Sequence, residues 1–296
     1  MRITGQMMTQ KLIGNIQNNM TRMEKWQRDL ATGKKIHSPS DDPVGTSYAL
    51  RYRSELAQND QFTKNVDSAN SWVQYTDKML DSATQVLQRA RELAVAGAND
   101  TQDVSAKRAI ADEIDQLYKQ MVAIGNSQFN GAYVFNGMLT DQKPYEEANA
   151  ELATPHAGVF RYEIGPGTML DVNTLGRDAF GTSPSSDNAF QALKDLRDAL
   201  INDSQPGVAN GISQVNNRIN EILEIRAGIG ARMNRLDLAE NRLTDIDLNL
   251  QTLQTKVEDT DMAETITKFK IAEDVYRASL NTGAHIIQPS LIDFLR

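Results

Sequence analysis

The sequence predicts a mainly α-helical protein, an elongated antiparallel bundle of coiled coils that carries a small β-rich insert. Three observations predict this fold. The eight prolines are unevenly spread, with none before Pro39, none between Pro43 and Pro144, and none between Pro206 and Pro289. Apolar residues recur at heptad spacing in the proline-free stretches, and the proline-rich middle alternates apolar with polar residues. Because proline costs about 3 kcal/mol inside a helix, the proline-free stretches can form long helices.

The first predicted helix lies within residues 1–40 and has a narrow apolar seam. Its members alternate at spacings of four and three residues, as at the a and d positions of a coiled coil. They are Leu12, Ile16, Asn19, Met23, Trp26 and Leu30. Asn19 is the polar member, and an asparagine in such a seam more often fixes the register of two helices than binds a ligand. A stripe this narrow predicts a helix that needs a partner helix.

Similar seams predict the other helices. One covers residues 62–94 and, after a loop, a second covers 110–124. In the C-terminal half a third seam covers 215–236 and then shifts by one residue to continue over 239–257, which changes the local winding of a coiled coil. The last seam consists of Phe269, Ala272, Tyr276, Leu280, Gly283 and Ile287. Long helices with thin seams predict that part of the apolar surface is left for other molecules to cover.

The predicted insert covers residues 138–186. Polarity alternates over 159–164 and again over 169–172, with a Gly-Pro-Gly turn between them, so we expect a β-hairpin among four or five short strands. We also expect an outer addition, so that deletion of 140–184 should be tolerated. The predicted domains are terminal segments 1–40 and 262–296, a helical rod of 41–137 and 187–261, and the insert.

Composition and motifs argue against an enzyme. The net charge of −8 disfavours a protein that binds nucleic acid or an acidic membrane surface, and no apolar stretch is long enough to span a bilayer. The absence of cysteine excludes thiolate chemistry and Cys-ligated metals. The three histidines, His37, His156 and His285, are far apart in sequence. We therefore predict no catalytic residue, no metal, no cofactor, no nucleic-acid partner and no membrane insertion.

One acidic pair has two interpretations. Asp41 and Asp42 lie between Pro39 and Pro43, and paired carboxylates can bind a metal or transfer protons. A structural turn is the better interpretation. Proline favours the first position of a helix, and an aspartate just before it can cap that helix.

Several motifs resemble the flagellin family. Leu-Gln-Arg-Ala-Arg-Glu-Leu at 87–93, Asn-Asp-Thr at 99–101 and Phe-Asn-Gly at 129–131 resemble its N-terminal region in order and spacing, while residues 226–236 and 258–264 resemble its C-terminal region. The resemblance covers 1–137 and about 187–296, and the insert is where members of the family differ. Two segments, Pro-Ser-Asp-Asp-Pro at 39–43 and the ending 289–296, depart from the flagellin pattern and resemble the hook-associated members instead.

The resemblance implies a structural component of the bacterial flagellum that forms the junction between hook and filament and allows flagellin to polymerise. It implies other copies of the chain in a ring, hook-associated protein type 1, flagellin, an export chaperone and the export apparatus as partners. It also implies an extracellular protein exported without a cleavable signal peptide. Two alternatives remain open. One is flagellin itself, and the other is a cytosolic coiled-coil adaptor, which would explain the heptads but not both flagellin-like ends.

Assembly interfaces are expected on both terminal segments and on the rod. The terminal positions come from the apolar seams and the chain ends, and the three rod positions come from the resemblance alone. The predicted interface residues are Ile3, Leu12, Ile16, Met23, Leu30, Arg89, Leu93, Glu113, Leu280, Ile287, Leu291, Phe294 and Leu295.

Overall fold

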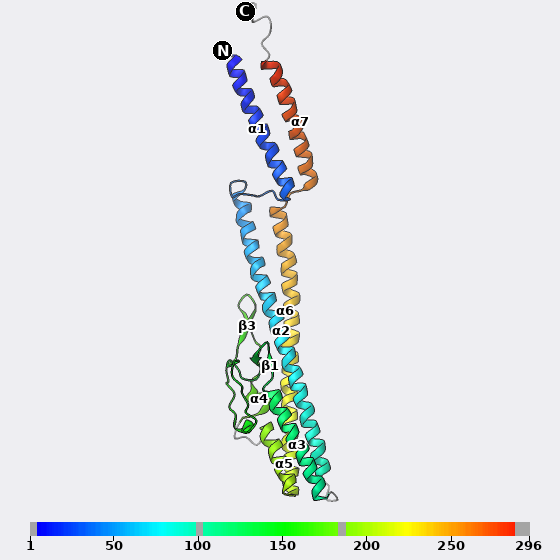
Figure 1. Cartoon of the computed structure of the whole chain (residues 1–296). Coiled ribbons are helices and arrows are strands. Elements are labelled where there is room, and N and C mark those ends of the chain that lie inside the picture. Colours follow the sequence, from blue (N-terminus) through cyan, green and yellow to red (C-terminus); the bar gives the residue numbers. More distant parts are fainter. Residues whose placement is uncertain (1–4, 99–102, 183–187, 288–296) are drawn as a thin grey trace, which may run out of the picture. The chain divides into compact units, whose positions relative to one another are not determined.

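The computed structural model describes residues 5–98, 103–182 and 188–287. Most of these residues are helical (Figure 1), which confirms the predicted mainly α fold. The helices are α1 (Gly5–Thr32), α2 (Pro43–Gly97), α3 (Val104–Gly125), α4 (Gly176–Phe180), α5 (Ala189–Ile201), α6 (Gln205–Glu258) and α7 (Met262–Ile287). Pro43 begins α2 and Pro206 lies in the first turn of α6, where a missing N–H costs little. Among the described residues, no helix is both long and apolar enough to cross a membrane.

Contacts divide the chain into two compact units. Unit 1 combines Met1–Ala57 with Asp247–Arg296, and unit 2 consists of Gln58–Ile246. The boundaries lie inside α2 and α6, because each of these helices continues from one unit into the other. The division into terminal segments, rod and insert stays a prediction.

Within unit 2, α2 and α6 run antiparallel. Asn59 donates its Nδ2 to the Leu243 carbonyl oxygen at 2.9 Å, and further along α2 Arg91 donates to Asn216 Oδ1 at 3.1 Å. Between these points Arg226 bonds to Asp77 and Asp81. As the residue number rises on α2 it falls on α6, which is the antiparallel pairing that the seams predict.

The helices α3 and α5 complete the helical part of unit 2. Asp103 caps α3 by accepting a hydrogen bond from the Val104 N–H, and Asn188 caps α5 by accepting from the Phe190 N–H at 2.9 Å. Side-chain oxygens at these positions satisfy N–H groups that have no partner inside the helix.

The predicted hairpin is confirmed as β3 (Arg161–Gly165) paired with β4 (Thr168–Asp171). Gly167 has φ of +67° in the turn between them, a conformation that glycine adopts without strain. The other described strands, β1 (Gln128–Phe129) and β2 (Ala132–Tyr133), precede the insert. The described part of the insert therefore has two strands rather than four or five.

Buried asparagines explain why the insert has so few strands. Asn136 donates to the carbonyl oxygens of Leu139 and Gln142, both at 3.0 Å, and Asn173 donates to that of Gly158 at 2.9 Å. These amides satisfy backbone groups that a strand would otherwise pair, so irregular chain can pack against the helices.

Aromatic side chains join the insert to the helices. Phe180 lies 5.0 Å from Phe135 and 5.5 Å from Phe190 between ring centroids, and Tyr145 lies 4.8 Å from Phe190. All four side chains are buried. The insert therefore contributes to the core of unit 2. These buried contacts contradict the prediction that residues 140–184 can be deleted, because the deletion would remove Tyr145 and Phe180 and leave their partners exposed.

The hydrophobic core is unevenly distributed. Of the described residues, Ala49 is the only buried hydrophobic one in unit 1, and all the others belong to unit 2. The folded chain thus has one well-buried unit and one whose helices meet through partly exposed seams.

Candidate assembly site

The terminal helices α1 and α7 form an antiparallel pair. Asn19 on α1 donates its Nδ2 to Ser279 Oγ on α7 at 2.9 Å, so the polar residue of the seam has a polar partner. Gly283 on α7 permits close approach, because a Cβ atom there would lie 2.9 Å from Leu12 Cδ2. The predicted seam residues of α1 are half-buried, and most residues between them are exposed; the seam is Leu12, Ile16, Asn19, Met23, Trp26 and Leu30.

Among the α7 seam residues whose side chains the structure describes, one differs from the prediction. Phe269, Ala272 and Tyr276 are half-buried as expected of seam residues, but Leu280 is 44% exposed. Ser279 takes the position facing α1, where it bonds to Asn19. Leu280 therefore remains at the surface, beside the seam rather than in it.

Other apolar side chains on the terminal pair also face solvent within this single chain. A groove of about 290 Å³ crosses its surface, and Trp26, Ile271 and Val275 line it. Lys268 Nζ lies 5.0 Å from the centroid of the Trp26 ring at the same place. The exposed apolar residues of α1 and α7 are Met7, Met8, Ile13, Met20, Met262, Ile266, Ile271, Val275 and Leu280.

Two short connections attach the terminal pair to α2 and α6, and they are bonded to each other. The Lys35 N–H donates to the Glu258 carbonyl oxygen at 2.8 Å, and the Thr260 N–H donates to the Gly33 carbonyl oxygen at 3.0 Å. This pairing is an isolated antiparallel bridge between Lys34 and Asp259.

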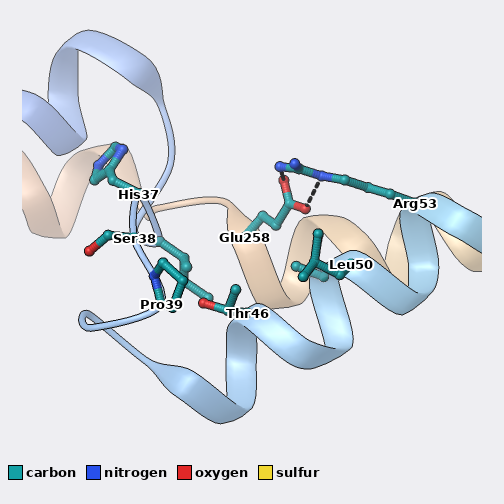
Figure 2. A pocket seen from close by; sticks show the side chains of 9 residues that line it. His37, Ser38, Pro39, Thr46, Leu50, Arg53 and Glu258 are labelled. Carbon is teal, nitrogen blue, oxygen red and sulfur yellow. Dashed lines mark hydrogen bonds and ion pairs between the residues drawn. The ribbon is translucent and has the colours of Figure 1, made fainter.

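Glu258, at the end of α6, is the central residue of these connections. Its carboxylate accepts hydrogen bonds from Arg53 Nε and Nη2, both at 2.7 Å (Figure 2). It also accepts a hydrogen bond from Lys34 Nζ at 2.9 Å. The side chain is 2% exposed. Burial acts to raise its pKa, but the bonds from Arg53, Lys34 and Gln254 outweigh burial and lower the pKa of Glu258 to about 2. The carboxylate is therefore charged at any pH near neutrality.

The acidic turn lies beside Glu258. The Asp42 carboxylate caps α2, accepting from the Val44 N–H at 3.1 Å and the Gly45 N–H at 2.9 Å. Asp41 accepts from the N–H groups of Ser38 and His37, and these bonds lower its pKa. Pro39 lines a cavity of about 90 Å³ next to Glu258, and Pro43 begins α2. No group of three or more His, Cys, Asp and Glu side chains suited to a metal ion occurs among the described residues.

The three predicted rod positions are close together, but they are not equivalent. Arg89 Nη2 lies 2.8 Å from Glu113 Oε1, and both side chains are about half exposed. Leu93 is 7% exposed and belongs to the core. Only Arg89 and Glu113 are therefore available to a partner without rearrangement of unit 2.

Some predicted residues cannot be placed. Ile3, Leu291, Phe294 and Leu295 lie outside the described residues. Ile287 ends α7, but its side chain is not among those described.

Sequence patterns did not predict Glu258, Arg53 and Lys34 as a group. Arg53 and Lys34 are separated from Glu258 by 205 and 224 residues, and none of the three belongs to an apolar seam. Glu258 begins the family-like motif 258–264, but that motif does not point to Arg53 or Lys34.

Comparison with known proteins finds a family match toward each end of the chain. The bacterial flagellin N-terminal helical region matches residues 3–140, and the bacterial flagellin C-terminal helical region matches residues 212–295. Flagellar hook-associated protein 3 of Escherichia coli is 25% identical, over 94% of this chain and 95% of its own length. Flagellin of Bacillus subtilis is 27% identical, over 91% of this chain and 90% of its own length.

Structural similarity extends to a hook-associated protein. The structure of a flagellar hook-associated protein from Vibrio parahaemolyticus has a TM-score of 0.69 at 19% identity, covering 74% of this chain and 100% of that one. At this identity the similarity shows the fold. Because the two flagellin regions together match most of the sequence, the chain belongs to the flagellin family.

Proposed function

We propose that the chain is a structural component of the bacterial flagellum that forms the junction between hook and filament and allows flagellin to polymerise onto the hook. The observation that carries assembly is unit 1, whose two terminal helices leave apolar side chains such as Ile13 and Ile271 exposed. An exposed apolar face of this kind marks an interaction surface. The fold similarity to a hook-associated protein and the name of the Escherichia coli relative support the junction rather than another flagellar position.

The proposed partners follow from that position. Copies of the chain form a ring, with hook-associated protein type 1 on the hook side and flagellin on the filament side. Before assembly, an export chaperone and the export apparatus handle the chain, which acts outside the cell. The proposed role is structural, not enzymatic.

The structure changes how the proposed interface residues divide. Leu12, Ile16, Met23 and Leu30 are half-buried within one chain, so we propose that their first role is to hold α1 and α7 together. Leu280 is on the outer surface, where it can contact a neighbouring copy. We propose that Ile3, Ile287, Leu291, Phe294 and Leu295 also contact neighbouring subunits.

The alternative function is that of flagellin itself, and the 27% identity to the Bacillus subtilis flagellin supports it. A filament subunit offers the same interface to each successive copy and polymerises without limit, whereas a junction protein has two different faces. The two functions therefore predict different positions along the appendage.

Deletion and labelling distinguish these functions. Cells that lack the chain should complete their hooks and release flagellin into the medium as monomer, and immunogold labelling of the restored chain should mark one short zone at the filament base. Label along the whole filament would identify a filament subunit instead. Retention of the chain in the cytosol of cells that have a working flagellar export gate would favour the cytosolic coiled-coil adaptor.

A further inference from the structure

A groove on unit 2 combines apolar and cationic groups. It has a volume of about 270 Å³ and lies between the turn of the β3–β4 hairpin and one face of α6. Leu238 on its rim is 71% exposed, and Leu243 and Ile246 contribute apolar surface. An exposed leucine next to a preformed apolar groove is typical of a docking surface.

Two arginines give this groove a positive charge. Arg235 and Arg242 line it, and neither forms an ion pair or a hydrogen bond with any residue that the structure describes. They are about 10 Å apart along α6, because seven residues of α-helix rise by that amount. In a chain with a net charge of −8, two unpaired cations beside an apolar groove favour an acidic partner with an apolar side chain.

The same chain carries a segment with the complementary properties. In the segment 141–152, Glu146 and Glu147 are exposed and form no ion pair within the described chain, and Leu152 is 62% exposed. The groove is thus apolar and basic, and the segment is apolar and acidic.

The acidic segment is already held in shape. The Tyr118 hydroxyl donates to the Glu147 carbonyl oxygen at 3.0 Å, and Asn126 makes two hydrogen bonds with the Tyr145 backbone, at 2.8 and 3.0 Å. Lys194 pairs with Glu151. Docking a segment that is already ordered costs less conformational entropy than docking a free loop.

Distance prevents one copy from filling its own groove with this segment. Arg218 on α6 lies near the segment, since its Nη1 donates to the Asp178 carbonyl oxygen at 3.2 Å, and Gly176, two residues before Asp178, lies against the Tyr145 hydroxyl. Arg235 lies about 26 Å further along α6 at the helical rise of 1.5 Å per residue. The segment is anchored near α3 and α5 by Tyr118 and Lys194, so its partner groove belongs to another molecule.

We infer that the segment 141–152 of one copy docks into the α6–hairpin groove of a neighbouring copy, with Leu152 against Leu238 and with Glu146 and Glu147 facing Arg235 and Arg242. The contact is heterologous, because it joins two different surfaces. Repetition of such a contact closes a ring when the rotation allows it. The inference rests on the proposed assembly of copies side by side, and it names the surfaces that meet.

Engineered cysteines test the contact in the assembled appendage. The chain has no cysteine, so Leu238→Cys with Leu152→Cys provides the only thiols. The full chain with both changes replaces the native copy in cells, and isolated appendages are treated with a short bis-maleimide and separated on a denaturing gel. We expect a ladder of covalent multimers, because each chain is linked to two neighbours.

Matched controls make every outcome informative. Asn19→Cys with Ser279→Cys, whose native side chains are hydrogen-bonded, should link within one chain and shows that the reagent works. Leu238→Cys with Val95→Cys uses a second site that is 57% exposed but outside the proposed surfaces, and it should give no ladder. No ladder from Leu238→Cys with Leu152→Cys while the first control links, or links from Leu238→Cys to flagellin or another protein, would overturn the inference.

Charge reversal tests the role of the arginines. Arg235→Glu with Arg242→Glu should reduce the cross-linked fraction about tenfold, since two attractive pairs become repulsive. Adding Glu146→Lys and Glu147→Lys should restore it, whereas Lys64→Glu, at an exposed position on α2, should leave it unchanged. The ladder reports the contact wherever immunogold places the protein, so failure of the contact and failure of the junction function are separate results.

Discussion

The Glu258 carboxylate accepts hydrogen bonds from Nε and Nη2 of Arg53, both at 2.7 Å, although the two residues are 205 positions apart in the sequence. A bidentate pair of this kind fixes orientation as well as distance. Lys34 reaches the same carboxylate from the connection after α1. One acid therefore ties the end of α6 both to α2 and to the link that leads into the terminal pair.

Glu258→Gln should loosen this part of unit 1. The pKa of Glu258 falls from an ordinary 4.5 to about 2 in the fold, so the charged form contributes stability that is present above pH 4.5 and is lost as the pH falls toward 2. We expect a loss of about 1–3 kcal/mol at pH 7, measured as faster amide hydrogen exchange at the start of α2 and the end of α6. The difference from the native chain should shrink below pH 4.5.

Glu55→Gln is the matched control for that change. Glu55 pairs with Arg51 in the same unit, but its side chain is 36% exposed and that of Arg51 is 70% exposed. Such pairs contribute less than about 0.5 kcal/mol. An equal effect of the two substitutions would show that burial of Glu258 has no special role.

Two glycines should respond oppositely to substitution. A Cβ atom added at Gly14 in α1 would meet nothing within 4 Å, so Gly14→Ala should stabilise the helix by about 0.5–1 kcal/mol. Gly283→Val should instead crowd the seam between α1 and α7, since even a Cβ atom would lie 2.9 Å from Leu12 Cδ2 and would force the Leu12 side chain to move. Helix content by circular dichroism and incorporation into appendages measure the two effects, and normal incorporation of Gly283→Val would show that close approach is not needed.

Phe180→Ala should destabilise unit 2 by about 3–5 kcal/mol, because it leaves a cavity among Phe135, Tyr145 and Phe190. Urea unfolding followed by circular dichroism gives the change. Met138→Ala, in the same insert but 60% exposed, should change stability by less than about 0.5 kcal/mol. A deletion of 140–184 that unfolds as cooperatively as the native chain would contradict the role assigned to the aromatic cluster.

The terminal helices should be the least protected part of the free monomer. Ala49 is the only buried hydrophobic residue described in unit 1, and a helix pair with a half-buried seam is marginal alone. Limited proteolysis of the monomer should trim both ends and leave a product of roughly residues 41–262. Equal protection of α1 and α6 in a verified monomer would argue against assembly-dependent ordering.

Local patterns predicted much of the fold. The α1 seam is correct at every position from Leu12 to Leu30 because helical periodicity is contained in the segment itself. On α7, apolarity favoured Leu280 for the seam, but Ser279 occupies that place because Asn19 needs a polar partner. The periodicity of one helix does not reveal what the facing helix requires.

Long-range features were beyond local patterns. The bonds from Arg53 and Lys34 to Glu258 depend on how distant segments meet. The irregular insert depends on Asn136 and Asn173, whose amides replace strand pairing. Neither arrangement produces a regular spacing of residues along the chain, so sequence patterns do not predict it.

The near absence of buried apolar residues from the described part of unit 1 makes the stability of the terminal helices depend on neighbouring subunits. Whatever binds the ordered state of α1 and α7 raises its population by mass action, so the apparent melting point of these helices increases with the concentration of neighbouring subunits. Unit 2, with its own core, has a melting point that is set within one chain. One polypeptide thus combines unit 2, whose stability is set within the single molecule, with terminal helices whose stability depends on the assembled subunits.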